Sequence, residues 1–132
     1  AQAAGLDVCS GGIMGLGEGI EDRIDMALSL RDLGIDSIPV NMLNPIPGTP
    51  MEKYESLDEK EMQRIIAVYR FILPKAFIRL AGGRGLMSDK GKACFMSGAN
   101  AAISGDMLTT AGITVDKDKK LLEELDYRIK PL

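Results

Sequence analysis

Three side chains of different chemistry stand in or at the end of short apolar runs: the Cys9 thiol, the Asn41 amide and the Arg79 guanidinium. Side chains alternate between the two faces of a strand, so Arg79 points away from any helices against which its apolar neighbours pack. The same alternation turns Cys9 away if Val8 packs against helices. We therefore expect a thiol, an amide and a guanidinium to converge on one cavity.

Each residue also has an ordinary structural interpretation. A buried cysteine is most often a small apolar residue, a strand arginine usually reaches solvent or a carboxylate, and an asparagine at a strand end often completes a turn. Cys94 lies on an expected helix between Ala93 and Phe95 and is interpreted as core.

The apolar runs alternate with amphipathic segments. Strands are expected over residues 6–9, 38–41, 76–80 and 99–104, and helices over 21–33, from the capping box at 56–59 to Pro74, over 88–96 and over 117–125. Ser56 and Glu59 have the spacing of a capping box for the second helix, and Ser88 is expected to cap the third. The last helix is expected to bury Leu121, Leu122 and Leu125.

The order βαβαβαβα favours parallel strands joined by right-handed crossovers. Four such α/β units are either half of a (β/α)8 TIM-type barrel or a small open doubly wound sheet. The strands are short and evenly spaced, and loops rich in glycine or proline follow the first three, where barrel enzymes keep their active sites. Residues 15–20 lack the third glycine of the dinucleotide fingerprint. We therefore predict half a barrel.

Composition excludes several classes of function. The chain has 132 residues, a net charge of −3 and no histidine, which gives no sign of nucleic acid or an acidic membrane as partner and excludes a Ser-His-Asp system within this chain. No apolar run is long enough to span a membrane. Two lone cysteines and no signal peptide predict a reducing, cytoplasmic location. The absence of an initiator Met predicts truncation at the N-terminus.

The surroundings of Cys9, Asn41 and Arg79 resemble biotin synthase, a family of radical S-adenosylmethionine enzymes, over nearly the whole chain. The later portion resembles the domain shared by biotin and thiamin biosynthesis enzymes. The similar stretches are Val8-Cys9-Ser10-Gly11-Gly12-Ile13-Met14-Gly15-Leu16-Gly17-Glu18, Asn41-Met42-Leu43, Pro47-Gly48-Thr49-Pro50, Ile78-Arg79-Leu80-Ala81-Gly82-Gly83-Arg84, Ala93-Cys94-Phe95-Met96-Ser97-Gly98-Ala99-Asn100, Gly105 and Leu108-Thr109-Thr110.

This resemblance implies that residues 1–132 are the C-terminal half of a TIM-type barrel in an enzyme that converts dethiobiotin to biotin. In that family a [4Fe–4S] cluster reduces S-adenosylmethionine to methionine and a 5′-deoxyadenosyl radical, which abstracts hydrogen from the substrate. A [2Fe–2S] cluster deep in the barrel is thought to supply the sulfur. The resemblance also implies a homodimer and an electron donor such as flavodoxin or ferredoxin.

Carried over by position, Cys9 and Arg79 match ligands of the [2Fe–2S] cluster, and Asn41 matches a residue that hydrogen-bonds dethiobiotin. An arginine ligand is unusual because a guanidinium resists deprotonation; a labile corner of this kind would suit a cluster that is consumed. The positions that match the S-adenosylmethionine pocket are Gly11, Ile13, Gly15, Glu18, Met42 and Asn44.

The C-x-x-x-C-x-x-C motif that holds the [4Fe–4S] cluster is absent here, as are two further thiolate ligands of the [2Fe–2S] cluster. The resemblance places them upstream of Ala1, so this chain alone is expected to assemble neither cluster and to be inactive.

Three alternatives remain at this stage. Another radical enzyme with this domain, such as the thiamin-pathway tyrosine lyase or the hydrogenase maturase, would not be expected to combine Cys9 and Arg79. A non-catalytic half-barrel could act as an association module whose free strand edges a second copy covers. A Schiff-base aldolase is disfavoured because no lysine stands at a strand end.

Overall fold

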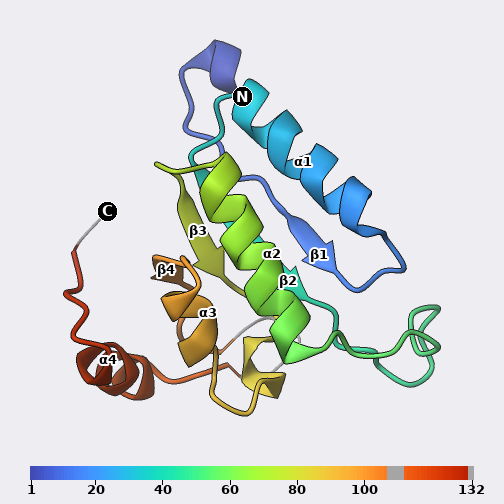
Figure 1. Ribbon diagram of the computed structural model, residues 1–132, viewed down its shortest axis with the longest axis vertical. Helices are drawn as coiled ribbons and strands as arrows, with labels where there is room; N and C mark the ends of the chain where they lie inside the picture. The colour runs from blue at the N-terminus through green and yellow to red at the C-terminus, as the bar shows by residue number, and fades with distance from the viewer. Residues whose placement is uncertain (107–111, 131–132) are drawn as a thin grey trace.

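The computed structural model describes residues 1–106 and 112–130, in which a parallel four-stranded sheet alternates with helices (Figure 1). The strands are β1 (Gly12–Met14), β2 (Ser37–Met42), β3 (Phe77–Leu80) and β4 (Ala101–Ala102). The helices are α1 (Ile20–Asp32), α2 (Glu59–Ile72), α3 (Lys92–Met96) and α4 (Val115–Glu124), with short 3-10 turns η1 (Gln2–Ala4) and η2 (Arg84–Leu86).

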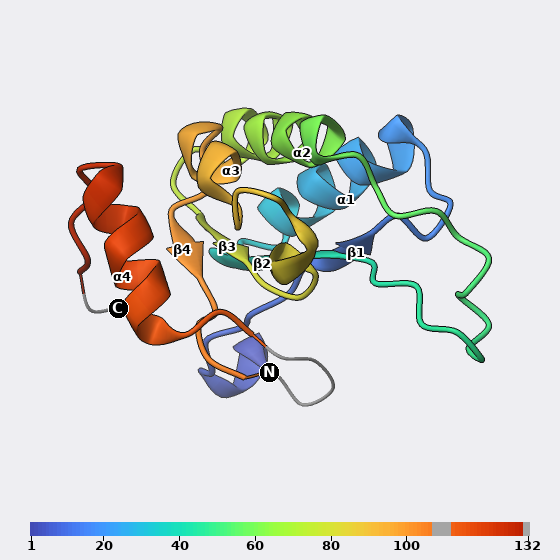
Figure 2. The ribbon, with the colours of Figure 1, turned by 90° about the horizontal axis from the view of Figure 1, so that it is seen from below.

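The strands lie side by side in sequence order, β1-β2-β3-β4, and every neighbouring pair is parallel. Helices α1, α2 and α3 lie on the same side of this sheet, and α4 lies beyond the β4 edge (Figure 2). A doubly wound sheet would reverse its strand order and carry helices on both faces. The predicted alternation of strands and helices and the parallel pairing are confirmed. The sequential strand order, with helices on one face, differs from a doubly wound sheet and is consistent with half a barrel. None of the described helices is both long and apolar enough to cross a membrane.

The first strand lies later in the chain than the sequence predicts. Instead of residues 6–9, β1 covers Gly12–Met14, and Cys9 makes only an isolated parallel bridge to Ser37. The pairs Cys9–Ser37 and Gly12–Val40 have the same offset in residue number, so the register of the two strands does not change between them. After the bond from Ser10 N–H to Ser37 C=O, the next bond of a parallel ladder would need an N–H at Pro39, which proline lacks. The proline therefore interrupts the ladder and delays β1.

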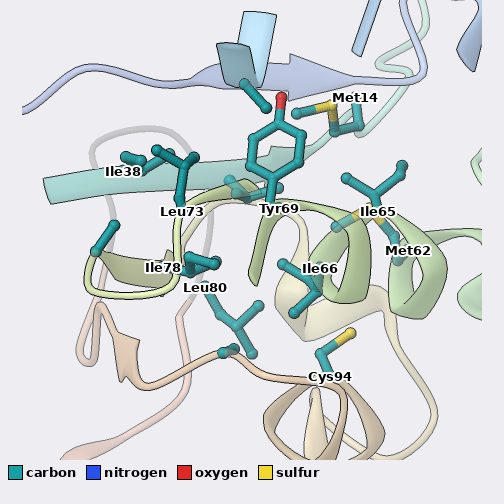
Figure 3. Packing of buried hydrophobic residues seen from close by; sticks show 14 of the residues in the cluster. Met14, Ile38, Met62, Ile65, Ile66, Tyr69, Leu73, Ile78, Leu80 and Cys94 are labelled. Carbon is teal, nitrogen blue, oxygen red and sulfur yellow. The ribbon is translucent and has the colours of Figure 1, made fainter. Parts of the chain in front are cut away.

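One apolar layer joins the sheet to α2 and α3 (Figure 3). Burial alternates along β2 and β3, where Ile38 and Ile78 are fully buried. Tyr69 of α2 is also fully buried, and this burial raises the pKa of its phenol to about 12. Cys94 is 2% exposed, and burial raises the pKa of its thiol to about 11, so its assignment to the core is confirmed.

Two predicted helix caps are wrong, and one contact explains both. The N-cap of α2 is Asp58 rather than Ser56, because the Glu59 carboxylate accepts hydrogen bonds from the backbone N–H and hydroxyl of Ser88. With Ser88 held there, α3 begins after Gly91, and Asp89 accepts from two N–H groups at its start. A tertiary contact has replaced two local ones.

The last helix is held both by its leucines, which pack against the edge of the core, and by buried polar contacts. Leu121, Leu122 and Leu125 are only half-buried, which corrects the expectation that they are buried. The Asp118 carboxylate of α4 is buried and binds both the Arg84 guanidinium and the Ser104 hydroxyl. This buried ion pair ties α4 to the segments that follow β3 and β4.

We predict that Gly83→Ala destabilises the fold far more than Gly34→Ala. Both glycines have a positive φ, 81° and 66°, so both substitutions incur left-handed strain of about 1–2 kcal/mol. A Cβ at Gly34 would meet nothing within 4 Å, whereas one at Gly83 would lie 2.1 Å from the Met42 carbonyl oxygen. Urea unfolding of the two variants measures the difference. Equal losses of unfolding free energy would show that the close contact is unimportant.

Candidate functional site on the open face of the sheet

The face of the sheet opposite α1–α3, here called the open face, carries the residues singled out in the sequence. They stand in layers along the strands, because residues two apart on a strand share a face. Successive layers are about 7 Å apart. From the amino to the carboxyl ends, the paired residues are Cys9 with Ser37, then Pro39 with Arg79, then Ile13 with Asn41.

Cys9 and Arg79 meet on this face although they are 70 residues apart in the chain. Nη1 of Arg79 lies 3.8 Å from Sγ of Cys9, and the Ser37 hydroxyl donates to the same sulfur at 3.3 Å. Cys9 is exposed and Arg79 is half-buried, while its neighbours Ile78 and Leu80 face the helices. The thiol and the guanidinium therefore converge as expected, whereas the Asn41 amide does not join them and contacts Gly12 and Gly82 instead. Among the described residues no group of three His, Cys, Asp or Glu side chains could hold a metal ion.

Asn41 lies at the carboxyl end of β2 and connects its two neighbouring strands. Its amide donates to the Gly12 carbonyl of β1 at 3.2 Å and accepts from the Gly82 N–H, just after β3, at 2.8 Å. A primary amide has two N–H donors and two acceptor lone pairs. One of each remains to bind a ligand, so Asn41 can both fasten the sheet and contact a substrate.

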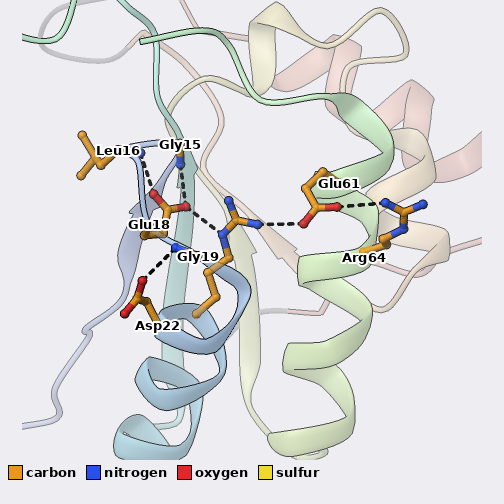
Figure 4. A network of polar contacts seen from close by, with 8 residues as sticks. Gly15, Leu16, Glu18, Gly19, Asp22, Glu61 and Arg64 are labelled. Atoms are coloured by element: carbon orange, nitrogen blue, oxygen red, sulfur yellow. Dashed lines mark hydrogen bonds and ion pairs between the residues drawn. The ribbon is translucent and has the colours of Figure 1, made fainter.

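The β1–α1 loop, residues 15–19, is held by the Glu18 carboxylate (Figure 4). This carboxylate accepts from the N–H groups of Gly15, at 2.8 Å, and Leu16, at 2.7 Å, and pairs with Nε of Arg23 at 2.8 Å. Burial on its own would raise the pKa of Glu18, but these hydrogen bonds together lower it below its usual value. Glu18 therefore fixes the backbone of the loop in its ionised form.

Arg23 is a site residue that the sequence interpretation missed. Its side chain is 10% exposed, and the guanidinium binds Glu18 through Nε and Glu61 of α2 through Nη1, both at 2.8 Å. A cation near the first turn of a helix is disfavoured by the helix macrodipole, so an arginine there suggests that a specific acidic partner holds it. This position is the one signal in the sequence that could have identified Arg23.

The remaining predicted residues differ in where they lie. Ile13 is 47% exposed on the open face, and Asn44 is half-buried in the loop after β2. Gly11 lies so close to β2 that a Cβ would be 2.0 Å from the Pro39 carbonyl oxygen. The side chain of Met42 is in the core, 5% exposed, so of this residue only the backbone can line a pocket on the open face.

A cleft of about 600 Å³ lies at the opposite end of the sheet, where β2 and β3 begin beside the N-terminal segment. Asp7, Asp36, Phe77 and Arg79 are among its lining residues. Arg79 thus borders both this cleft and the thiol of Cys9, whereas Asn41 and the β1–α1 loop lie toward the carboxyl end.

The fold and these residues define an α/β protein with polar groups layered on the face of a parallel sheet that its helices leave open. Residues 39–128 match the family model described as the Biotin and Thiamin Synthesis associated domain, and the chain belongs to that family.

Curated relatives match almost the whole chain. It is 72% identical over 130 residues to the biotin synthase of Brachyspira hyodysenteriae, covering 98% of this chain and 39% of the relative. It is 60% identical over 129 residues to biotin synthase 2 of Corynebacterium diphtheriae, with 98% and 39% covered, and 59% identical over 130 residues to the biotin synthase of Akkermansia muciniphila, with 98% and 40% covered. The chain thus spans about two fifths of the length of these relatives.

We predict that Glu18→Gln removes an acid-dependent part of the stability. Because the folded-state pKa of Glu18 lies below its usual value of 4.5, ionised Glu18 stabilises the fold above that pH, and the contribution is lost as the pH falls through the folded-state pKa. The free energy of unfolding of wild type should exceed that of the variant at neutral pH, and the gap should shrink in acid. A gap that is constant from pH 7 to pH 3 would contradict the assignment.

Proposed function

We propose that this chain is the C-terminal part of a biotin synthase, a radical S-adenosylmethionine enzyme that inserts sulfur into dethiobiotin to form biotin. The single observation that carries the proposal is the 3.8 Å contact between Cys9 and Arg79 on the open face. It stands in a chain that is 72% identical to a protein named biotin synthase. We propose residues 1–132 as the second half of a TIM-type barrel whose interior is the open face.

The spacing of this pair fits one corner of an iron–sulfur cluster. A sulfur and a nitrogen donor bound to one tetrahedral metal, at about 2.3 and 2.1 Å, lie roughly 3.6 Å apart. Sγ of Cys9 and Nη1 of Arg79 are 3.8 Å apart. Cys9 and Arg79 would therefore hold the [2Fe–2S] cluster from this half, and the other thiolates and the [4Fe–4S] ligands would come from the part of the relatives that this chain does not cover.

The layers on the open face put the proposed roles in a consistent order. Cys9 and Arg79 lie deepest, Asn41 lies at the carboxyl end of β2, and the β1–α1 loop follows β1. Asn41 would hold dethiobiotin through its free N–H and lone pair. When bound, S-adenosylmethionine supplies the radical and the [2Fe–2S] cluster the sulfur.

The pocket for S-adenosylmethionine would take its shape from the β1–α1 loop and the start of the β2–α2 loop. Ile13 presents an apolar surface there, and the backbone of Met42 and the side chain of Asn44 would complete the pocket. The proposed residues of this pocket are Gly11, Ile13, Gly15, Glu18, Met42 and Asn44.

The proposal also covers the cellular location, the oligomeric state and the electron donor. We place the enzyme in the cytoplasm, as a homodimer that receives electrons from a flavodoxin or ferredoxin. The match to a domain shared with thiamin synthesis leaves the tyrosine lyase as the alternative, and the Cys9–Arg79 pair favours biotin synthase over it.

The full-length protein, with both clusters reconstituted without oxygen, should convert dethiobiotin to biotin when given S-adenosylmethionine and a reductant. Mass spectrometry of the product measures this. The isolated chain, treated in the same way, should form no biotin. Cleavage of tyrosine by the full-length protein, with dethiobiotin left unchanged, would instead support the thiamin-pathway alternative.

Cys9→Ser and Arg79→Met should act specifically on the proposed [2Fe–2S] cluster in the full-length protein. Removing a thiolate ligand should lower the iron and sulfide bound per chain and abolish biotin formation, whereas Arg79→Met should change the cluster's absorption spectrum and slow turnover. Cys94→Ala is the matched control, since Cys94 is a buried core thiol. Iron content and turnover that are unchanged in Arg79→Met would leave this arginine without a special role.

A further inference from the structure

We propose that Arg23 is a positioning residue, which holds the β1–α1 loop in the conformation that binds S-adenosylmethionine. The inference rests on the proposed function, since it assigns that ligand to the loop. It adds a residue that the sequence interpretation missed, and the side chain of this residue lies behind the loop instead of on the open face.

The Arg23 guanidinium divides its donors between two carboxylates from different parts of the chain. Nε donates to Glu18 in the loop and Nη1 donates to Glu61 in the first turn of α2, each at 2.8 Å (Figure 4). The Arg23 side chain is 10% exposed, so solvent competes little for these contacts. A planar guanidinium can make both bonds at once, whereas a lysine ammonium on a flexible stem acts as a point charge.

Arg23 acts on the backbone of the loop through Glu18, which it holds in place. Both oxygens of this carboxylate accept backbone N–H groups, at Gly15 and Leu16. The side chain of Glu18 is 17% exposed, and without Arg23 it would be a half-buried charge with no counter-ion. It would then turn toward water, and the loop N–H groups would lose their acceptor.

Glu61 supplies the fixed end of this arrangement. It belongs to α2, whose inner side is packed in the core, and it also accepts from the exposed Arg64 at 3.0 Å. The β2–α2 connection supports the loop at a second point, since a Cβ at Gly17 would lie 3.0 Å from Cε1 of Tyr54. The second β/α unit therefore braces the loop of the first from two sides.

The test uses the full-length protein with its clusters reconstituted, and measures the affinity for S-adenosylmethionine by equilibrium dialysis. Arg23→Met should weaken binding about tenfold, the loss expected when a charge-assisted hydrogen bond is removed. Arg23→Lys should recover part of the affinity. Arg64→Met is the matched control, because Arg64 is 72% exposed and contacts only the far oxygen of Glu61, and it should bind as wild type does.

Saturating S-adenosylmethionine should restore the biotin yield of Arg23→Met, because a residue that positions the loop changes affinity and not the later steps. Unchanged affinity in Arg23→Met, accompanied by a lower melting temperature, would overturn the inference and leave Arg23 as a bridge between α1 and α2. If Arg23→Met does not fold, Glu61→Gln replaces it and should weaken binding about threefold; unchanged affinity there would overturn the inference too. Wild-type protein that binds no S-adenosylmethionine would overturn the proposed function itself.

Discussion

The site depends on the alternation of side chains along β2 and β3. Burial of Ile38 and Ile78 against the helices turns Pro39 and Arg79 to the open face. A register slip of one residue would move Arg79 into the core, where an unpaired guanidinium is strongly unfavourable, and would expose an isoleucine. The apolar layer that stabilises the sheet is thus the same feature that presents the polar groups, and the site needs no separate scaffold.

The interruption opposite Pro39 shapes the deepest layer of the open face. The chain there keeps its register without forming a continuous ladder, and Gly11 allows it to approach β2 more closely than any residue with a Cβ could. Cys9 is therefore held by a single bridge to Ser37, with its sulfur exposed beside Arg79. Its backbone is anchored while its exposed sulfur touches only polar side chains of the neighbouring strands, so the sulfur stays accessible from the open face.

Features that depend on neighbouring residues could be predicted from the sequence, whereas features that depend on contacts with distant residues could not. The placement of Arg79 on the open face needed only the alternation of its own strand, and that prediction agrees with the structure. The start of β1 could not be predicted from its own residues, because a proline on the partner strand decides it. The capping box failed for a similar reason: Ser88, 29 residues away, binds Glu59 in place of the local partner. Arg23 was missed because its second partner, Glu61, lies 38 residues away and on another helix.

Several groups at this site use their hydrogen-bonding capacity on the protein before any ligand arrives. Asn41 bridges β1 to the segment after β3, and Glu18 binds two backbone N–H groups and Arg23. Such side chains are fixed in direction without a ligand, so binding requires little reordering of the protein. It also follows that their replacement alters stability and ligand affinity together. Arg23 belongs with them, although it acts on the loop from behind, because it holds the Glu18 carboxylate that binds the loop backbone.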